Sequence, residues 1–165
     1  MYIGLNQYAA PGAGGKLRSR KGVITINIAF FLIPKKEVVY LPLTCTMRQA
    51  IERMEYHRYS AVPLIDGDGK YAGTLTEGDL LWKMKNTPGL SFADTDKILV
   101  ADIPRRVENA PVRIEATIDS LLSLAVTQNF VPVVDDHGVF IGIIRRREII
   151  EYFAAQLAKL KSGGK

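Results

Sequence analysis

The sequence predicts an α/β fold made of two copies of one small unit that joins strands to helices. The run Ser60-Ala61-Val62-Pro63-Leu64-Ile65-Asp66 returns as Asn129-Phe130-Val131-Pro132-Val133-Val134-Asp135, and glycines follow both runs at matching positions. Matching residues lie 69 positions apart without a gap. A repeat of this length indicates one supersecondary unit used twice, with a hydrophobic face on each copy that the other can cover. We therefore expect ligands in a pair of related clefts between the copies.

A two-stranded hairpin is expected in each copy. The apolar runs 62–65 and 131–134 are rich in branched residues, as buried strands are, and each contains a proline that cannot donate to a strand ladder. The turns Asp66-Gly67-Asp68-Gly69 and Asp135-Asp136-His137-Gly138 have the composition of hairpin connections, and a second apolar strand is expected directly after each.

Helices are expected on both sides of each hairpin. Before the hairpins, apolar residues recur at helical spacing; they are Met47, Ala50, Ile51 and Met54 in the first copy and Ile118, Leu121, Leu122, Ala125 and Val126 in the second. Thr46-Met47-Arg48-Gln49 is a capping box that fixes the start of the first helix. The apolar stretch 23–33 is interpreted as the entry strand of the first copy, so each copy is strand, helix, strand, strand, helix.

Gly73, Thr76 and Asp79 follow the pattern Gly-x-x-Thr-x-x-Asp, and with it the unit resembles the cystathionine-β-synthase-type (CBS) domain. Two such units in tandem resemble the CBS pair, or Bateman module, and imply two repeats packed with pseudo-two-fold symmetry. The resemblance covers about 28–153. The second copy departs from the pattern, because Arg145 and Glu148 stand where the pattern has Thr and Asp. Its helix-to-proline segment is also two residues shorter, so the loop before its proline must be tighter.

The repeats and the composition of the first residues together predict a division of the chain. The expected parts are a basic, Gly-rich leader at 1–24, a first repeat at 25–86, a linker at 87–100, a second repeat at 101–155, and a helix end and tail at 156–165.

The charge of the chain is uneven. The net charge is +5, and the leader supplies four of these charges without any acidic residue; they are Lys16, Arg18, Arg20 and Lys21. We interpret the leader as a solvated tail rather than a nucleic-acid-binding arm, so nucleic acid is not expected as a partner.

Cysteine content and hydropathy favour a cytoplasmic protein that does not enter a membrane. The single cysteine, Cys45, cannot form an internal disulfide, which favours a reducing compartment. The stretch 23–33 is about half of the ~20 residues that a membrane-spanning helix needs, and Thr25 and Asn27 interrupt it.

Catalytic and metal sites are not expected. Gly12-Ala13-Gly14-Gly15-Lys16 lacks the first glycine and the final hydroxyl of a phosphate-binding loop. Cys45 has no histidine near it in the sequence, so a small buried hydrophobe is the simpler interpretation. His57 and His137 have no second ligand at metal spacing, although His57 could lie near a ligand phosphate. No nucleophile and base can be assembled, and an enzyme is therefore not expected.

The resemblance implies that adenine lies between the two repeats. Backbone groups of the first strand and of the residues before the proline hold the base, while the Asp of the pattern holds the ribose diol. A carboxylate can accept from both ribose hydroxyls, and a Thr at a helix start offers a hydroxyl and free backbone donors to phosphate. The base-holding groups and the polar helix start come from opposite repeats.

The first cleft combines Thr76 and Asp79 with the second repeat's pre-proline segment, namely Gln128, Asn129, Phe130 and Val131. The alternative for Thr76 and Asp79 is a capping box that needs no ligand.

The second cleft combines an arginine-rich helix start with the first repeat's strands. Its expected residues are Val38, Val39, Tyr40, Tyr59, Ser60, Ala61 and Val62, with Arg145, Arg146, Arg147 and Glu148 opposite. Arginine fits phosphate bidentately, and a helix N-terminus adds positive potential. The alternative is that these arginines are solvated or paired with Glu148 and Glu151.

A narrower resemblance concerns the ligand. Asp102-Ile103-Pro104-Arg105, Asn129-Phe130-Val131 and Gly142-Ile143-Ile144-Arg145-Arg146 are similar to small stand-alone CBS-pair proteins of Gram-positive bacteria, some of which bind cyclic di-AMP. That similarity implies adenine contacts from Val39, Tyr59, Ser60 and Ala61 and a phosphate contact from Arg146. Asp79 departs from this group, which leaves the first cleft open to a plain adenine nucleotide. The expected ligand is AMP, ADP, ATP or cyclic di-AMP, with no required cofactor.

These observations predict a regulatory module rather than an enzyme. We expect a homodimer that senses an adenine nucleotide and signals to a protein effector whose identity the sequence does not reveal. An apolar stripe on the last helix could bury against a second copy; it consists of Ile149, Ile150, Phe153, Leu157 and Leu160. The alternative is a ligand-free interaction or dimerisation module.

Overall fold

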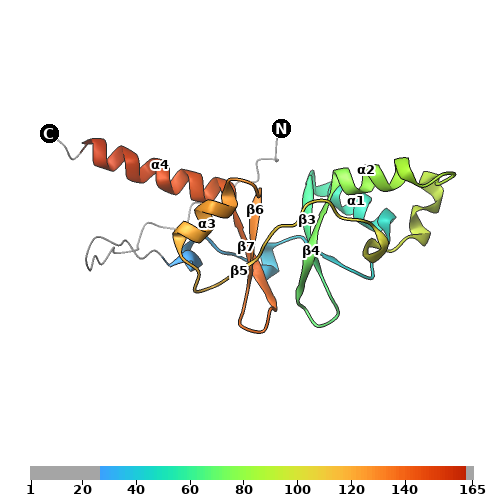
Figure 1. The fold of residues 1–165 in the computed structure, drawn as a ribbon, viewed down its shortest axis with the longest axis horizontal. Helices are drawn as coiled ribbons and strands as arrows, with labels where there is room; N and C mark the ends of the chain where they lie inside the picture. Colours follow the sequence, from blue (N-terminus) through green and yellow to red (C-terminus); the bar gives the residue numbers. More distant parts are fainter. Residues whose placement is uncertain (1–26, 163–165) are drawn as a thin grey trace. The chain divides into compact units, whose positions relative to one another are not determined.

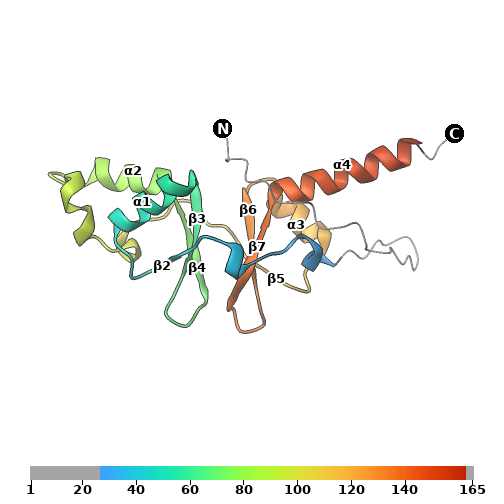
Figure 2. The ribbon, with the colours of Figure 1, turned by 180° about the vertical axis from the view of Figure 1, so that it is seen from behind.

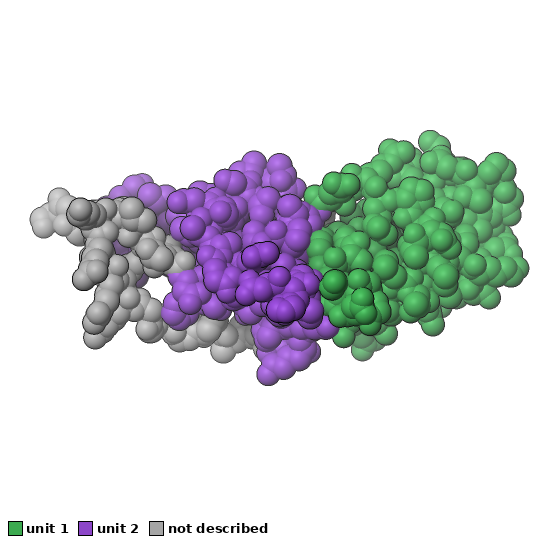
Figure 3. Space-filling model, turned by 60° about the horizontal axis from the view of Figure 1, so that its bottom comes forward, with its two compact units in different colours: residues 1–17, 39–108 green, residues 18–38, 109–165 purple. Residues whose placement is uncertain are grey.

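The computed structural model describes residues 27–162, so the predicted leader at 1–24 lies outside the described residues. The chain divides into two compact units (Figure 3). Of the described residues, unit 1 holds 39–108, and unit 2 holds 27–38 together with 109–162.

Unit 1 contains a three-stranded sheet in the order β2-β3-β4. β2 (Leu41–Pro42) is parallel to β3 (Ala61–Ile65), and β3 is antiparallel to β4 (Tyr71–Thr76). Helices α1 (Met47–His57) and α2 (Glu77–Asn86) pack against this sheet (Figure 1). The sheet and the two helices share one apolar core, which consists of Leu41, Cys45, Met47, Ala50, Met54, Val62, Leu64, Leu75, Leu80, Val100 and Ile103.

Both helices of unit 1 begin with a capping box. The Thr46 hydroxyl accepts from the Gln49 amide at 3.2 Å, and the Gln49 side chain accepts from the Thr46 amide at 2.9 Å. These bonds satisfy backbone donors that a helix start otherwise leaves free, and they confirm the predicted start of α1. Thr76 and Asp79 cap α2 in the same way.

The predicted linker folds onto unit 1. It contains the 3-10 helix η3 (Phe92–Lys97), and a second one, η4 (Val100–Asp102), begins at its last residue. The Met47 amide donates to the Ile98 carbonyl at 2.7 Å, and the Val100 amide donates to the Cys45 carbonyl at 2.8 Å. Since Val100 is also fully buried, this segment completes the core of unit 1.

Unit 2 contains a four-stranded sheet in the order β1-β7-β6-β5. The strands are β1 (Ile33–Pro34), β7 (Phe140–Arg145), β6 (Phe130–Val134) and β5 (Val112–Arg113). β5 is parallel to β6, whereas β7 is antiparallel to both of its neighbours.

Two helices and two short 3-10 turns complete unit 2. They are α3 (Ile118–Ala125), α4 (Arg146–Ser162), η1 (Ile28–Phe31) and η2 (Lys35–Glu37). The second half of α4 extends past the sheet of unit 2 (Figure 2). The core is again apolar and consists of Ile28, Val112, Ile118, Leu121, Ala125, Val131, Val133, Ile144 and Ile149.

The repeat predicted from the sequence is present at the level of strand register. Ala61 lies opposite Thr76 in unit 1, and Phe130 lies opposite Arg145 in unit 2, with both members of the pair shifted by 69 positions. Both hairpins also have a register irregularity at the same place, between Leu64 and Ile65 and between Val133 and Val134. The mixed α/β fold with two copies of one unit is thereby confirmed.

The interpretation of 23–33 as the entry strand of the first repeat is wrong where the structure describes it. The Asn27 side chain accepts from the Ala29 amide at 2.9 Å, which starts a 3-10 turn rather than a strand. Ile28 is then fully buried in the core of unit 2, and Ile33 pairs with Ile143 of β7. Residues 23–26 lie outside the described part.

The predicted strand Val38-Val39-Tyr40 is also wrong, because pairing begins only at Leu41. The Val38 amide closes η2 by donating to the Lys35 carbonyl at 3.1 Å. The Tyr40 carbonyl accepts from the Arg53 guanidinium at 3.4 Å instead of from a neighbouring strand.

The apolar stripe predicted on the last helix divides between two faces of α4. Ile149 is fully buried, and Phe153 packs against the core of unit 2. Ile150 and Leu157 are 57% and 59% exposed. These two residues are seven positions apart and therefore lie on one face of the helix.

Gly142 determines whether β1 can pair with β7. A methyl group at this position would overlap the carbonyl oxygen of Ile33 and would lie 2.8 Å from Cδ1 of Leu32. Gly142→Ala should destabilise the protein by about 1 to 3 kcal/mol, because the backbone of β1 must move away. We expect a fall of roughly 2 to 12 °C in Tm by circular dichroism.

Gly67→Ala is the matched control, since no atom lies within 4 Å of the added methyl group. Equal melting temperatures for the two variants would contradict the close approach of β1 to Gly142.

Candidate functional site

In each unit, the start of the second helix is hydrogen-bonded to the residue before the first hairpin strand. The Glu77 amide donates to the Ser60 carbonyl at 3.1 Å, and the Arg146 amide donates to the Asn129 carbonyl at 3.0 Å. These bonds hold the pre-proline residues next to the polar helix start of the same repeat, whereas each predicted cleft combines such groups from opposite repeats. We call Tyr59, Ser60, Ala61, Thr76 and Asp79 half-site 1, and Asn129, Phe130, Arg145, Arg146 and Glu148 half-site 2.

Asp79 of half-site 1 is 2% exposed and has three donors. Its Oδ2 accepts from the amide of Thr76 at 2.9 Å and from the Thr76 hydroxyl at 2.7 Å. Its Oδ1 accepts from the backbone amide of Arg106 at 3.0 Å. The capping role considered from the sequence is therefore present, and the ribose-binding role of Asp79 stays a prediction.

The predicted base-holding side of half-site 1 is half-buried. The Tyr59 amide donates to the Met54 carbonyl at 3.0 Å, after Arg58 has ended α1 with a left-handed backbone at φ 58°. The ring of Tyr59 packs against the core and stacks on His57, with ring centres 5.5 Å apart. Val62 is fully buried, so only its backbone groups are available to a ligand.

The pre-proline segment of unit 2 is more closed. The side chains of Phe130 and Val131 lie in the interior, which leaves their backbone groups as possible ligand contacts. The Gln128 side chain accepts from the Ala110 amide at 2.9 Å and donates to the Ala110 carbonyl at 3.2 Å. These two hydrogen bonds to a neighbouring segment fix the position of the Gln128 side chain. The prediction of a tighter loop before Pro132 is wrong, because the shortening lies in the helix. α3 has 8 residues against 11 in α1, and the loop before the strand is residues 126–129 here against 58–60 in unit 1.

Two of the three arginines at the start of α4 are paired with carboxylates. Arg145 donates to Glu148 at 2.5 Å, and Arg147 donates to Glu151 at 2.6 Å. The Glu151 contact raises the pKa of Arg147 above its usual value. Arg146 instead donates to the neutral amide oxygen of Asn129 at 2.7 Å, so that contact leaves its charge uncompensated.

Val38 and Val39 were expected to line one cleft together. Val38 belongs to unit 2 and Val39 belongs to unit 1, and both are half-buried. The structure therefore does not join them in one strand.

The sequence-based site omitted Arg105 and Arg106, which lie beside half-site 1. The side chain of Arg105 lies against Gly73, and the guanidinium of Arg106 lies 5.7 Å from the centre of the Trp82 ring. A sequence signal for this segment exists, because Ile103-Pro104-Arg105-Arg106 repeats Ile33-Pro34-Lys35-Lys36. The pattern of an apolar residue, proline and two basic residues therefore lies near the start of both repeats.

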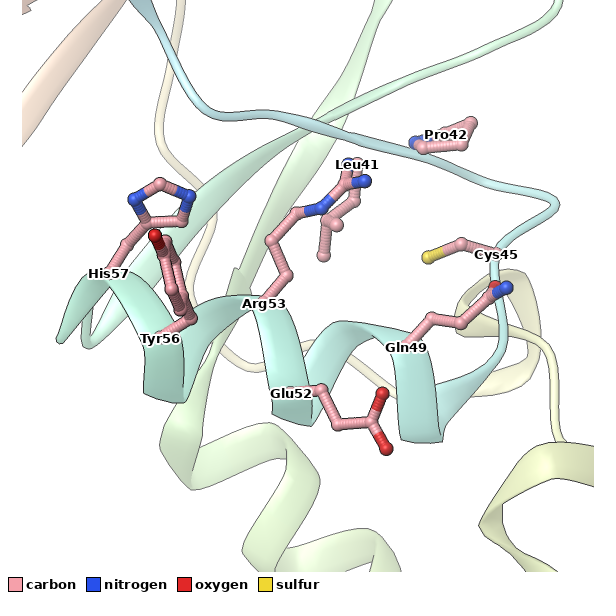
Figure 4. Close-up of a pocket in the computed structure, with 8 residues that line it drawn as sticks. All are labelled: Leu41, Pro42, Cys45, Gln49, Glu52, Arg53, Tyr56 and His57. Atoms are coloured by element: carbon pink, nitrogen blue, oxygen red, sulfur yellow. The ribbon is translucent and has the colours of Figure 1, made fainter.

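An open groove of about 490 Å³ runs along α1 in unit 1 (Figure 4). Its lining consists of Leu41, Pro42, Cys45, Gln49, Glu52, Arg53, Tyr56 and His57. Apart from His57, none of these residues was expected to contact a ligand. Burial raises the pKa of the Cys45 thiol, and the nearby charge of Arg53 only partly opposes that rise.

Within residues 27–162, no group of three or more His, Cys, Asp or Glu side chains is arranged to hold a metal ion. No helix in that part of the chain is both long enough and apolar enough to cross a membrane.

A family model of the CBS domain matches residues 32–86 and 100–155. The chain belongs to the CBS-domain family. The two matched stretches correspond to the two repeats recognised from the sequence, and CBS domains are regulatory modules.

Comparisons with individual CBS proteins agree with this assignment. The chloroplastic CBS domain-containing protein CBSX1 of Arabidopsis thaliana is 25% identical over 173 residues, covering 86% of this chain and 71% of CBSX1. A structure of CbpB in complex with c-di-AMP has a TM-score of 0.73 and 22% identity, covering 84% of this chain and 91% of CbpB. A structure of CBSX2 in complex with AMP has a TM-score of 0.63 and 22% identity, covering 80% of this chain and 98% of CBSX2.

Cys45 of this CBS protein should react slowly with thiol reagents. Because the thiolate is the reactive form, a raised pKa lowers the reactive fraction, and burial limits access to it. We expect iodoacetamide at pH 8 to label the native protein at least tenfold more slowly than the urea-unfolded protein, as measured by mass spectrometry.

A cysteine placed at the exposed neighbour Thr44, in a Cys45→Ala background, is the matched control and should label quickly in the native state. If Cys45 labels as fast as that control, its burial is not maintained in solution.

Proposed function

We propose that this CBS protein is a regulatory module that binds an adenine nucleotide and catalyses no reaction. The proposed ligand contacts are the backbone groups before the strand prolines and the polar helix starts. In addition to the residues of the two half-sites, they include Val38, Val39 and Val62. The observation that carries the proposal is the duplicated hydrogen bond from Glu77 to Ser60 and from Arg146 to Asn129. In both repeats it holds a pre-proline carbonyl beside the start of a helix, where backbone donors favour anions.

The ligands named for two structures of the same fold support an adenine nucleotide. CbpB was solved with c-di-AMP and CBSX2 with AMP. Both ligands contain adenine, ribose and phosphate, which match the base-holding backbone, the carboxylate and the arginines considered above. We propose AMP, ADP, ATP or cyclic di-AMP as the ligand class.

Half-site 2 is the proposed phosphate-binding part. The arginine fork offers two parallel donors to a phosphate. Arg146 is bound to a neutral partner, so a phosphate can replace Asn129 without separating an ion pair. The pair between Arg145 and Glu148 is partly exposed, with 52% of the Arg145 side chain and 28% of the Glu148 side chain accessible, and ion pairs in contact with solvent contribute little to stability.

We further propose that the protein forms a homodimer and transmits nucleotide binding to a protein effector. Ile150 and Leu157 support dimerisation, because they form an exposed apolar pair on one face of α4. A cytoplasmic location stays a prediction, supported by a single cysteine in the whole sequence.

A thermal-shift screen tests the proposed function directly. The compounds are AMP, ADP, ATP, cyclic di-AMP and, as a differently charged adenosine compound, S-adenosylmethionine. A ligand at 100 times its Kd should stabilise the protein by about 2.7 kcal/mol, which raises Tm by several degrees. If no compound shifts Tm and none gives heat on titration, the ligand-free interaction module replaces this proposal.

Substitution of Arg146 tests the assignment of the phosphate contact. Arg146→Ala should weaken nucleotide binding by about 1.5 to 3 kcal/mol, because a charge-assisted bond to phosphate is lost. The loss should shrink at high salt, since Arg146 is only half-buried and salt screens its charge. Calorimetric titration at two salt concentrations measures both effects.

Arg147→Ala is the matched control, because Arg147 is one position away and is held by Glu151. It should leave affinity nearly unchanged. If Arg147→Ala weakens binding as much as Arg146→Ala, general positive charge rather than a specific contact attracts the ligand.

A further inference from the structure

The Asp79 carboxylate already accepts a hydrogen bond from a segment that is distant in the sequence. The Arg106 amide, 27 residues ahead, donates to Oδ1 at 3.0 Å, while Thr76 occupies Oδ2. The residues that carry this amide, 104–106, are called the strap. All three strap residues are exposed, although the preceding Ile103 is 2% exposed and is part of the core of unit 1.

The strap has no regular structure of its own. Beyond Ile103, its position in unit 1 depends on the bond to Asp79 and on two side-chain contacts. Arg105 lies against Gly73, where an added methyl group would lie 3.2 Å from Nε of Arg105. The charge of Arg105 partly offsets the burial that raises the pKa of Tyr71 to about 12. Arg106 lies over the ring of Trp82.

Oδ1 is the oxygen that a ribose diol would need. Oδ2 is committed to the start of α2, because the Thr76 amide and hydroxyl both donate to it. With Asp79 only 2% exposed, a ribose cannot reach its carboxylate in this conformation. Movement of the strap would free Oδ1, and the Arg106 amide would then be hydrated at little cost because Arg106 is exposed.

Unit 2 has no matching contact among its described residues. Its equivalent carboxylate, Glu148, pairs with the side chain of Arg145 and is 28% exposed. A carboxylate that accepts from a backbone amide of a distant segment is therefore found in half-site 1 but not in half-site 2, and it is not part of the fold that the repeats share.

We propose that the strap is an autoinhibitory contact, in which the Arg106 amide and the ribose diol of a nucleotide compete for the Asp79 carboxylate. This inference rests on the proposed nucleotide-binding function. Nucleotide binding at half-site 1 then releases the strap, and release changes the segment that leads into the second repeat. The strap would thereby couple nucleotide binding at Asp79 to the conformation of the segment that joins the two repeats.

A pair of variants at one position isolates the amide. Arg106→Ala and Arg106→Pro both remove the guanidinium, but only proline lacks the backbone N–H. In calorimetric titrations of the full chain with AMP, Arg106→Pro should bind about tenfold more tightly than Arg106→Ala, because its strap cannot compete. Equal affinities would overturn the strap proposal.

Hydrogen exchange in the unmodified protein provides a second measurement that does not depend on how Arg106→Pro folds. Saturating AMP should speed exchange of the Arg106 amide at least tenfold by NMR, while the Glu77 amide, which is bonded to Ser60, stays protected. Trp82 is the only tryptophan in the sequence, so its fluorescence should change in the same titration.

The outcomes separate the two proposals. If AMP binds but the exchange rate of Arg106 does not rise, the strap proposal fails and the proposed function stands. If neither the unmodified protein nor either variant binds AMP or cyclic di-AMP, the proposed function fails, and the strap proposal fails with it because no nucleotide competes for Asp79.

Discussion

The fold depends on one backbone hydrogen bond that occurs twice, from the first amide of a helix to the carbonyl that precedes a buried strand. Glu77 donates to Ser60 in unit 1, and Arg146 donates to Asn129 in unit 2. Each bond closes a hairpin whose register is the same in both units, so the helix start is fixed relative to the pre-proline residues. Since these backbone groups need no particular side chain, the two copies can differ in chemistry without differing in fold.

The side chains of the two half-sites differ in charge. Half-site 1 has a threonine and a buried carboxylate, and its charge is satisfied by backbone and hydroxyl donors. Half-site 2 has two arginines; the charge of Arg145 is satisfied by Glu148, whereas Arg146 donates to the neutral side chain of Asn129. A phosphate at half-site 2 meets a side chain that must release only a neutral amide, whereas a ribose at half-site 1 must displace a bond to a buried charge. Each of these two bonds has one ionised partner and is charge-assisted. The Asp79 carboxylate is 2% exposed whereas the Arg146 contact is exposed, so water can replace the bond at half-site 2 at lower cost.

The features predicted correctly from the sequence are those that local residues determine. The hairpins follow from a proline-containing apolar run and an Asp/Gly turn, and the start of α1 follows from Thr46 and Gln49 three positions later. The errors concern the unit with which a segment folds. The apolar stretch 23–33 marks Ile28 as a buried residue, but it cannot tell that the burial is in unit 2. The apolar residues of the last helix likewise do not tell which of the two neighbours, Ile149 or Ile150, faces the core. The partner of Asp79 was missed for the same reason, because Arg106 is 27 residues away.

The contact between Asp79 and Arg106 also bears on the meaning of a Thr-x-x-Asp pattern. The pattern satisfies the start of a helix without any ligand, and here Thr76 uses one carboxylate oxygen completely. The second oxygen is therefore the only part of the carboxylate that can distinguish a helix cap from a nucleotide contact. In this structure a backbone amide holds that oxygen, and the amide belongs to the segment that leads into the second repeat. A ribose that replaces the amide would therefore act on the chain connection itself, which gives nucleotide occupancy a direct structural consequence within unit 1.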